Sequence, residues 1–319
     1  MAQTRAIGVA EENVLVQSGN CSVTILPELG GKIASIRVKD QELLQAPLAP
    51  LEPRTLTMPF DDSDASGWDE CLPSVAQCAV KTEAGLAEVP DHGDLWRVLW
   101  ETITTDGASA TLRGECFSLP LALERTVAVT EDGAGWQLRL DYKVTNNGSY
   151  PAPWSWAAHA LFAAEPGDRV ELPNTIHNLR LEGSGGNRLG RNGDTVAWPV
   201  AALAEGGTTD LSIAQPPESG IGDKLFTAPL AAAENWCALV RPSAGVRIRV
   251  HFDTAKTPYL GLWICHGGWP DRPGTKQTCV ALEPSTAPVD SLAQSGVWSR
   301  TLAPGESFSW PMFVDLQIL

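Results

Sequence analysis

The amino-acid sequence predicts an all-β protein built as one large antiparallel β-sandwich or barrel, and three observations support this prediction. Several segments alternate apolar and polar residues with a period of two, which is typical of half-buried strands. The 319 residues include 29 Gly and 24 Pro, scattered as expected for many turns between short strands. No segment repeats apolar residues at i, i+3, i+4 and i+7 over three turns, so long helices are not expected.

The clearest strand pattern covers residues 136–144, WQLRLDYKV, where five apolar or aromatic residues alternate with four polar ones. The same alternation returns at 246–252, VRIRVHF, and between Phe308 and Ile318 near the C-terminus. Shorter β-type runs lie at 22–26, 125–130 and 259–264. Together these segments predict many antiparallel strands with one face in a core.

Turn signals such as Asp132-Gly133 separate the predicted strands. Residues 201–205 and 230–235 have room for a helical turn or two, but not for a long helix. No internal repeat, low-complexity linker or change in composition divides the chain. We therefore expect a single domain over residues 1–319.

The charge balance excludes two classes of partner. The chain has 23 Lys and Arg against 38 Asp and Glu, a formal net charge of −15, and no basic run. Nucleic acid and anionic membranes are therefore not expected partners, since both require clustered positive charge. A small neutral molecule is the favoured ligand, and the sequence leaves both a monomer and a homodimer open.

Motifs for metals and cofactors are missing from the sequence. Its seven Cys include no C-x-x-C pair, and its five His show neither H-x-H nor H-E-x-x-H spacing. The glycine cluster at 183–190 lies between turn-rich segments rather than between a strand and a helix. We expect no metal and no cofactor. Because the sequence has no apolar leader and no long apolar segment, we expect a cytoplasmic protein with free thiols.

Two histidines lie in segments that suit a binding site. In 89–96, VPDHGDLW, Pro and Gly predict a turn with His92 at its tip. In 151–161, PAPWSWAAHAL, His159 stands in an otherwise apolar stretch. Taken alone, His92 fits a turn residue bonded to local backbone, and His159 fits either a core residue or the polar member of an aromatic pocket.

A carboxylate forms the third candidate. In 279–285, CVALEPS, alternation places Glu283 on the same side as two small residues, and Pro284 keeps Glu283 extended at the end of a strand. A carboxylate in this position suits a general base, although a capping or paired surface Glu fits the same pattern.

Taken together, these segments resemble a known family. The segments are PELGGKIASI at 27–36, GWDECLP at 67–73, PDHG at 90–93, SWAAHALFAAEPG at 155–167, DKLF at 223–226, YLGLWI at 259–264 and ALEPS at 281–285. Their order and spacing resemble the aldose 1-epimerase, or galactose mutarotase-like, family over most of the chain. The resemblance implies a large antiparallel β-sandwich of the supersandwich type. It also implies interconversion of the α and β anomers of a free aldose without a metal or organic cofactor.

The resemblance also implies roles for three residues. It aligns His92 and His159 with the family's two active-site histidines, and Glu283 with its catalytic glutamate. Mutarotation requires a base at the C1 hydroxyl and an acid at the ring oxygen. We therefore expect Glu283 to act as the base and His159 as the acid, with His92 orienting the sugar and stabilising charge on the ring oxygen.

Further residues are expected to bind the substrate. Asp223 of DKLF matches an aspartate that binds sugar hydroxyls in the family. Arg54 is the only arginine where galactose-type members carry an Asn-Arg pair before the first histidine, so galactose itself is not implied. The remaining candidates are Asp69 and Glu70 for hydroxyls, and Trp96, Trp154 and Trp263 for the C–H face of a pyranose. Core packing is the alternative role for each of these tryptophans.

Two other functions stay open at this point. One is a mutarotase for an anionic sugar, such as a sugar phosphate or a sulfonated hexose, which requires two or more basic side chains near the site. The other is a carbohydrate-binding protein of the same fold without turnover. A protein that only binds sugar has no use for an acid and a base on either side of C1.

Overall fold

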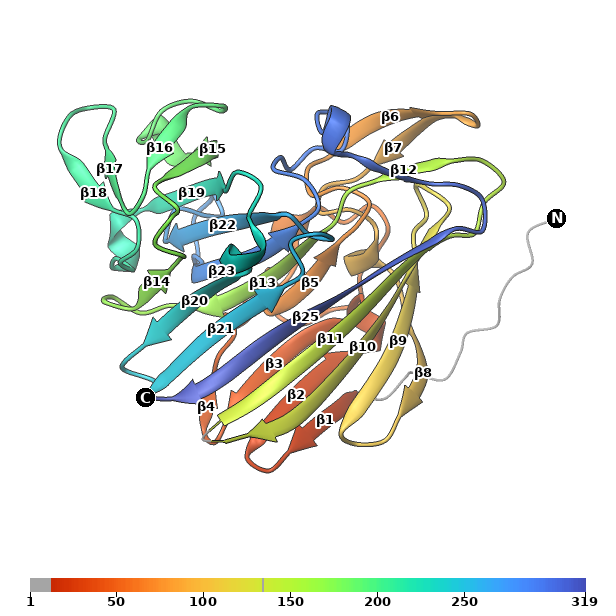
Figure 1. The fold of residues 1–319 in the computed structure, drawn as a ribbon, viewed down its shortest axis with the longest axis horizontal. Helices are drawn as coiled ribbons and strands as arrows, with labels where there is room; N and C mark the ends of the chain where they lie inside the picture. Colours follow the sequence, from red (N-terminus) through yellow and green to blue (C-terminus); the bar gives the residue numbers. More distant parts are fainter. Residues whose placement is uncertain (1–12, 134) are drawn as a thin grey trace.

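The computed structural model describes residues 13–133 and 135–319, and two large antiparallel sheets dominate it (Figure 1). The N-terminal residues on which the expected lack of a leader rests lie outside the described residues. Apolar side chains of both sheets join in one extensive core cluster. The predicted all-β sandwich is therefore confirmed.

The first sheet carries 11 strands. Their order is β1 (Val14–Ser18), β2 (Cys21–Leu26), β3 (Lys32–Val38), β5 (Trp68–Cys71), β13 (Ala157–Ala163), β23 (Thr278–Ser285), β22 (Tyr259–His266), β19 (Ile221–Phe226), β15 (Asn178–Ser184) and β16 (Thr195–Ala197), with β4 (Gln41–Glu42) paired to β3. Strands far apart in the sequence are thus neighbours in the middle of this sheet.

The second sheet carries eight strands. Their order is β14 (Arg169–Glu171), β20 (Trp236–Arg241), β21 (Val246–Phe252), β25 (Ser307–Ile318), β11 (Gly135–Asn146), β10 (Leu121–Asp132), β9 (Ser109–Glu115) and β8 (Glu101–Thr105). Three two-stranded sheets pair β6 (Cys78–Thr82) with β7 (Gly85–Val89), β12 (Ala152–Trp154) with β24 (Arg300–Leu302), and β17 (Val200–Ala202) with β18 (Thr208–Asp210).

Helical structure in the described ranges consists of three-residue 3₁₀ turns. These are η1 (Pro27–Leu29), η2 (Phe60–Asp62), η3 (Leu95–Arg97), η4 (Gly185–Asn187), η5 (Pro217–Ser219), η6 (Ala232–Glu234) and η7 (Gly296–Trp298). The turn considered at 230–235 therefore forms, as η6. The one considered at 201–205 does not, because β17 pairs with β18 there.

The predicted strand periodicity agrees with burial. Along β11, Leu138, Leu140, Tyr142 and Val144 are at most 1% exposed, while Arg139 between them is exposed. Each such buried apolar side chain contributes about 1.5–3 kcal/mol to folding. Strand β21 covers residues 246–252 as predicted, and its apolar residues point into the same core.

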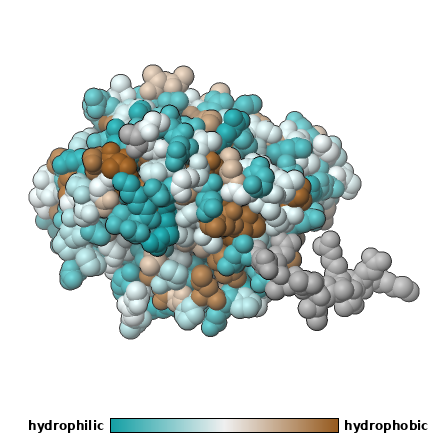
Figure 2. Space-filling model, turned by 90° about the horizontal axis from the view of Figure 1, so that it is seen from below, coloured by the Kyte–Doolittle hydropathy of each residue, from teal (hydrophilic) through white to brown (hydrophobic). Residues whose placement is uncertain are grey.

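Large exposed apolar side chains are dispersed over the surface. The face in Figure 2 is mostly hydrophilic or intermediate, and its hydrophobic side chains form separate small patches. Single exposed apolar residues are normal for a folded protein. Across residues 13–133 and 135–319, no helix has the length and apolar character needed to span a membrane.

Candidate active site

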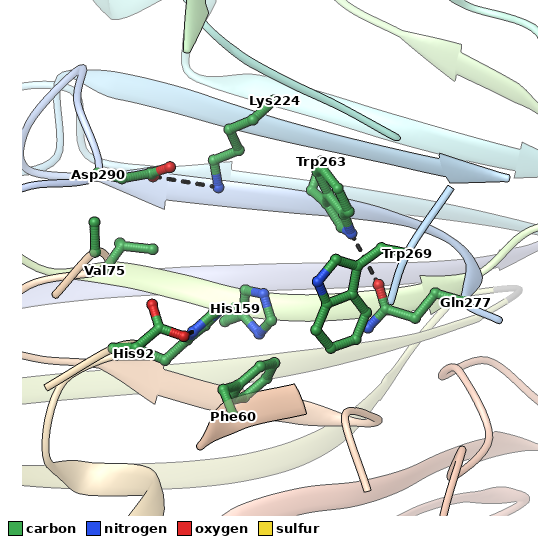
Figure 3. A pocket seen from close by; sticks show the side chains of 11 residues that line it. Phe60, Val75, His92, His159, Lys224, Trp263, Trp269, Gln277 and Asp290 are labelled. Carbon is green, nitrogen blue, oxygen red and sulfur yellow. Dashed lines mark hydrogen bonds and ion pairs between the residues drawn. The ribbon is translucent and has the colours of Figure 1, made fainter. Parts of the chain in front are cut away.

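A cavity of about 180 Å³ lies over the central strands of the first sheet (Figure 3). Its lining residues are Phe60, Val75, Ala76, Asp91, His92, His159, Lys224, Trp263, Trp269, Gln277 and Asp290. In Figure 3, Lys224 and Asp290 lie on one side of the cavity, His92 and Phe60 lie on the other, and His159 lies between them. Acidic, basic and aromatic groups thus surround one small space.

The sheet register brings His159 and Glu283 together. Strand β13 pairs Ala157 with Ser285 and Leu161 with Ala281 of β23. His159 falls midway between these pairs, opposite Glu283, and directly opposed residues of antiparallel strands project from the same face. Two residues separated by more than a hundred positions in the sequence are therefore neighbours.

A glycine makes room for the Glu283 carboxylate. Gly261 of β22 is the direct partner of Glu283 in the sheet. A Cβ atom at this position would lie 3.1 Å from Oε2 of Glu283 and 2.9 Å from the Phe226 ring. Both distances are too short for unstrained packing, so the absent side chain of Gly261 is what accommodates Glu283.

His92 is held by three contacts. Its backbone has a positive φ of 57°, an uncommon conformation for a residue other than glycine. Its ring stacks on Phe60 with centroids 3.6 Å apart, and its backbone N–H donates to the Val75 oxygen. Nδ1 lies 2.9 Å from Oδ2 of Asp91. Because a carboxylate only accepts hydrogen bonds, Nδ1 carries the proton, and Nε2 is free for a ligand.

Electrostatics distinguish the two histidines. Their ring centroids are 4.9 Å apart. Burial, and after it the positive charges of His92 and two lysines, hold the pKa of His159 well below its usual value. Burial also acts on Asp91, but the hydrogen bond and charge of His92 outweigh it and lower the pKa of Asp91. At neutral pH His159 is therefore neutral, and the Asp91 carboxylate is the hydrogen-bond partner of the His92 ring.

Glu283 is not among the residues that line the cavity; it lies behind Lys224, which is. It is fully buried, its Oε2 accepts a hydrogen bond from Nζ of Lys224, and its Oε1 has no partner. Nζ also lies 3.6 Å from Oδ1 of Asp290. Burial raises the pKa of Asp290 to about 6, although Lys224 opposes this rise. Burial lowers the pKa of Lys224, but Asp290 and Glu283 outweigh burial and raise it.

Comparison with solved structures identifies the architecture. A protein of Synechocystis sp. PCC 6803, Slr1438, is 18% identical, with a TM-score of 0.68 over 99% of this chain and 100% of the other. A galactose mutarotase-like protein of Lactobacillus casei is 16% identical, with a TM-score of 0.66 over 96% and 100%. A galactose mutarotase related enzyme of Lactobacillus acidophilus is 14% identical, with a TM-score of 0.66 over 96% and 97%.

The chain has the galactose mutarotase-like fold. At these identities the similarity establishes the fold alone. No protein-family model matches the sequence, and no curated protein matches it.

The expected tryptophans occupy different parts of this galactose mutarotase-like fold. Trp263 lines the cavity, and its Nε1 donates to Oε1 of Gln277 at 2.9 Å. Trp96 is fully buried behind Phe60, with ring centroids 5.2 Å apart. Trp154 is fully buried in the core against Trp310. Of the three, Trp263 is the one with a face open to a ligand.

Three expected polar residues belong to buried ion pairs outside the cavity lining. Arg54 and Asp69 contact each other at 3.3 Å, and Lys32 donates to Asp69 at 2.6 Å. Glu70 accepts hydrogen bonds from Arg125 at 3.0 Å and from two aromatic side chains, Tyr142 and Trp156. These charged groups pair with other protein groups, and none of the three residues lines the cavity, so the structure does not bring them to the ligand space.

Asp223 faces away from the cavity. Successive residues of a strand project to opposite faces, and in β19 it is Lys224 that points into the cavity. The Asp223 carboxylate pairs instead with Arg188 and accepts a 2.7 Å hydrogen bond from Ser184. The expected contact between Asp223 and a sugar hydroxyl is therefore not supported by its position.

No sequence pattern indicated several of the residues that line the cavity. Lys224 follows Asp223 directly in the sequence. Alternation places the two side chains on opposite faces of the strand, but only the pairing of β19 with β22 shows which face meets the cavity. Asp290 lies in the loop after β23, where its backbone oxygen accepts hydrogen bonds from the backbone N–H groups of Val75 and Ala76. Phe60 begins the short 3₁₀ turn η2 and Trp269 lies in the loop after β22, and neither segment has a periodicity that indicates the direction of a side chain.

Proposed function

We propose that this protein is an isomerase of the aldose 1-epimerase type, which interconverts the anomers of a free aldose. One observation carries the proposal. The register of the first sheet sets Glu283 opposite His159, and the ring centroids of His159 and His92, which both line the cavity, are 4.9 Å apart. The shared fold with galactose mutarotase-like proteins adds support.

The proposed chemistry needs two proton transfers. Glu283 accepts the proton of the C1 hydroxyl while the bond between C1 and the ring oxygen breaks and the C1 carbonyl forms. The ring oxygen takes a proton from a histidine. Rotation about the bond between C1 and C2 presents the other face of the aldehyde, and the reverse transfers close the ring with C1 inverted.

Electrostatics support His92 as the proton donor. Nδ1 of His92 donates to Asp91, so a proton that His92 transfers to the sugar is the one on Nε2 of the imidazolium form, whereas burial holds the pKa of His159 well below its usual value. We therefore propose that His92 protonates the ring oxygen and that His159 accepts a hydrogen bond from a sugar hydroxyl. This exchanges the roles expected for the two histidines from the sequence.

A neutral monosaccharide is the proposed substrate. The cavity volume of about 180 Å³ is below the roughly 300–1,000 Å³ of pockets that hold drug-sized ligands, so it suits one sugar ring. Phe60, Trp263 and Trp269 offer aromatic faces to its C–H surface. Lys224 is the one Lys or Arg among the described lining residues, and two carboxylates neutralise it. A sugar phosphate or sulfonate would lack the paired cations it needs.

The test is NMR exchange spectroscopy between anomers over a panel of neutral, phosphorylated and sulfonated aldoses. We expect accelerated exchange for at least one neutral aldose. Acceleration restricted to anionic sugars would replace the proposed substrate class. Binding without acceleration for every member would leave the carbohydrate-binding function instead.

A further inference from the structure

Lys224 is the least expected group in the site. Its ammonium group lies between two carboxylates, in contact with Oε2 of Glu283 and 3.6 Å from Oδ1 of Asp290. Both the Lys224 and the Asp290 side chains line the cavity, whereas Glu283 lies behind Lys224. An ammonium group has three N–H donors, so Lys224 can serve both carboxylates and keep one donor for a ligand.

The Lys224 ammonium is the counter-charge of the Glu283 carboxylate. A fully buried carboxylate without a partner becomes protonated rather than remain ionised, and a protonated Glu283 cannot act as a base. Yet a lysine held only by Glu283 would also reduce the tendency of Glu283 to take a proton. Asp290, which lines the cavity, offers the ammonium a second partner, and Figure 3 shows this pair.

We infer that Lys224 is a positioning residue for the base: shared between Glu283 and Asp290, it keeps Glu283 ionised, and Asp290 draws it aside so that Glu283 can reach the sugar. This inference rests on the proposed function, because it concerns the base of that reaction. Asp290 is thereby assigned a role, although no motif in the sequence indicated it.

Other charged and titratable groups face this unit from neighbouring elements. They are Cys71 of β5, His159 of β13, Glu182 of β15, Cys279 of β23, and Asp91 and His92 of the loop after β7. None of their positions bridges Glu283 and Asp290 as Lys224 does. Removing Lys224 and removing Asp290 should therefore have opposite effects on Glu283.

The two variants give opposite shifts of the pH–rate profile. In Lys224→Met, Glu283 loses its counter-charge, so the acid limb of kcat moves to higher pH by about 1–3 units. In Asp290→Asn, Lys224 belongs to Glu283 alone, so the acid limb moves to lower pH and kcat on the plateau falls about tenfold. Lys224→Arg should recover part of the wild-type profile, and Lys143→Met, an exposed lysine of β11, serves as control.

The experiment combines these profiles with carboxyl ¹³C NMR titration of Glu283 and Asp290 in the sugar-free protein. The expected result is that the Glu283 titration moves up in pH in Lys224→Met and down in Asp290→Asn. If the wild type is active but the Glu283 titration moves in the same direction in both variants, or does not move, the positioning role of Lys224 is overturned while the proposed function stands. If the wild type accelerates no aldose, the proposed function falls, and the positioning role falls with it. Circular dichroism shows whether each variant is folded. If Lys224→Met does not fold, Lys224→Arg provides the comparison.

Discussion

Replacing Glu70 by Gln tests whether this residue stabilises the fold or binds sugar. Glu70 and Arg125 are both fully buried, and their charged atoms lie 3.0 Å apart. Gln keeps the shape of the side chain but leaves the Arg125 charge without a counter-charge. Breaking a buried pair in this way costs about 3–5 kcal/mol.

This cost corresponds to a measurable fall in the melting temperature. An unfolding entropy of about 2.1 cal/mol/K per residue gives about 0.67 kcal/mol/K for 319 residues. A loss of about 3–5 kcal/mol then lowers the melting temperature by about 4–7 °C. Scanning calorimetry and urea unfolding at pH 7 measure both quantities.

The matched control is Glu171→Gln, which breaks a partly exposed pair with Arg247 and should cost about 0–1 kcal/mol. In Glu70→Gln we expect KM for the best aldose to stay within about twofold, because Glu70 lies outside the cavity lining. A stability within 1 kcal/mol of wild type, combined with a clearly raised KM, would refute this reasoning and return Glu70 to the binding site.

Three further changes test other parts of the site. Gly261→Ala places a methyl group 3.1 Å from Oε2 of Glu283. We expect kcat to fall at least tenfold and the free energy of unfolding to fall by about 1–3 kcal/mol. An unchanged kcat in steady-state kinetics would contradict the role of Gly261 in making room for Glu283. Asp91→Asn removes the carboxylate that accepts the hydrogen bond from Nδ1 of His92 and orients its ring, so kcat should fall about 10²-fold with little change in KM. A pure KM effect would count against the donor role of His92. Folding raises the pKa of Asp290 from 3.8 to about 6, so the folded protein holds this proton more tightly than the unfolded chain does. The resulting stabilisation is fully present below pH 4 and disappears as the pH rises through 6. This stabilisation amounts to about 3 kcal/mol. In Asp290→Asn the free energy of unfolding should therefore change less between pH 4 and 6 than in the wild type, and an unchanged slope would contradict the raised pKa of Asp290.

The sequence was sufficient to predict the strands but not their partners. Alternation identified 136–144 and 246–252 because a strand with one face in the core must bury every second residue. It also placed Glu283 on the face opposite Val280 and Leu282, as found. What alternation cannot give is the order of strands in the sheet, and that order is what brings His159 beside Glu283.

The errors in the site come from the same limit. Asp223 and Lys224 point to opposite faces, and deciding which faces the cavity requires the pairing of β19 with β22. Arg54 and Asp69 are polar residues of the kind that bind sugar, yet a buried lysine and aspartate near them form an ion-pair cluster that no local pattern reveals. Trp154 and Trp263 are the same residue type, and only tertiary contacts separate core from cavity.

The most direct test of the central claim is the rate of anomer exchange in Glu283→Gln, measured by NMR with the best aldose. The control is again Glu171→Gln, which lies away from the cavity lining. If Glu283 is the base, its amide variant should lose about 10²–10⁴ of the catalysed rate while the control keeps the wild-type rate. A Glu283→Gln protein that is folded and exchanges anomers at the wild-type rate would contradict the claim.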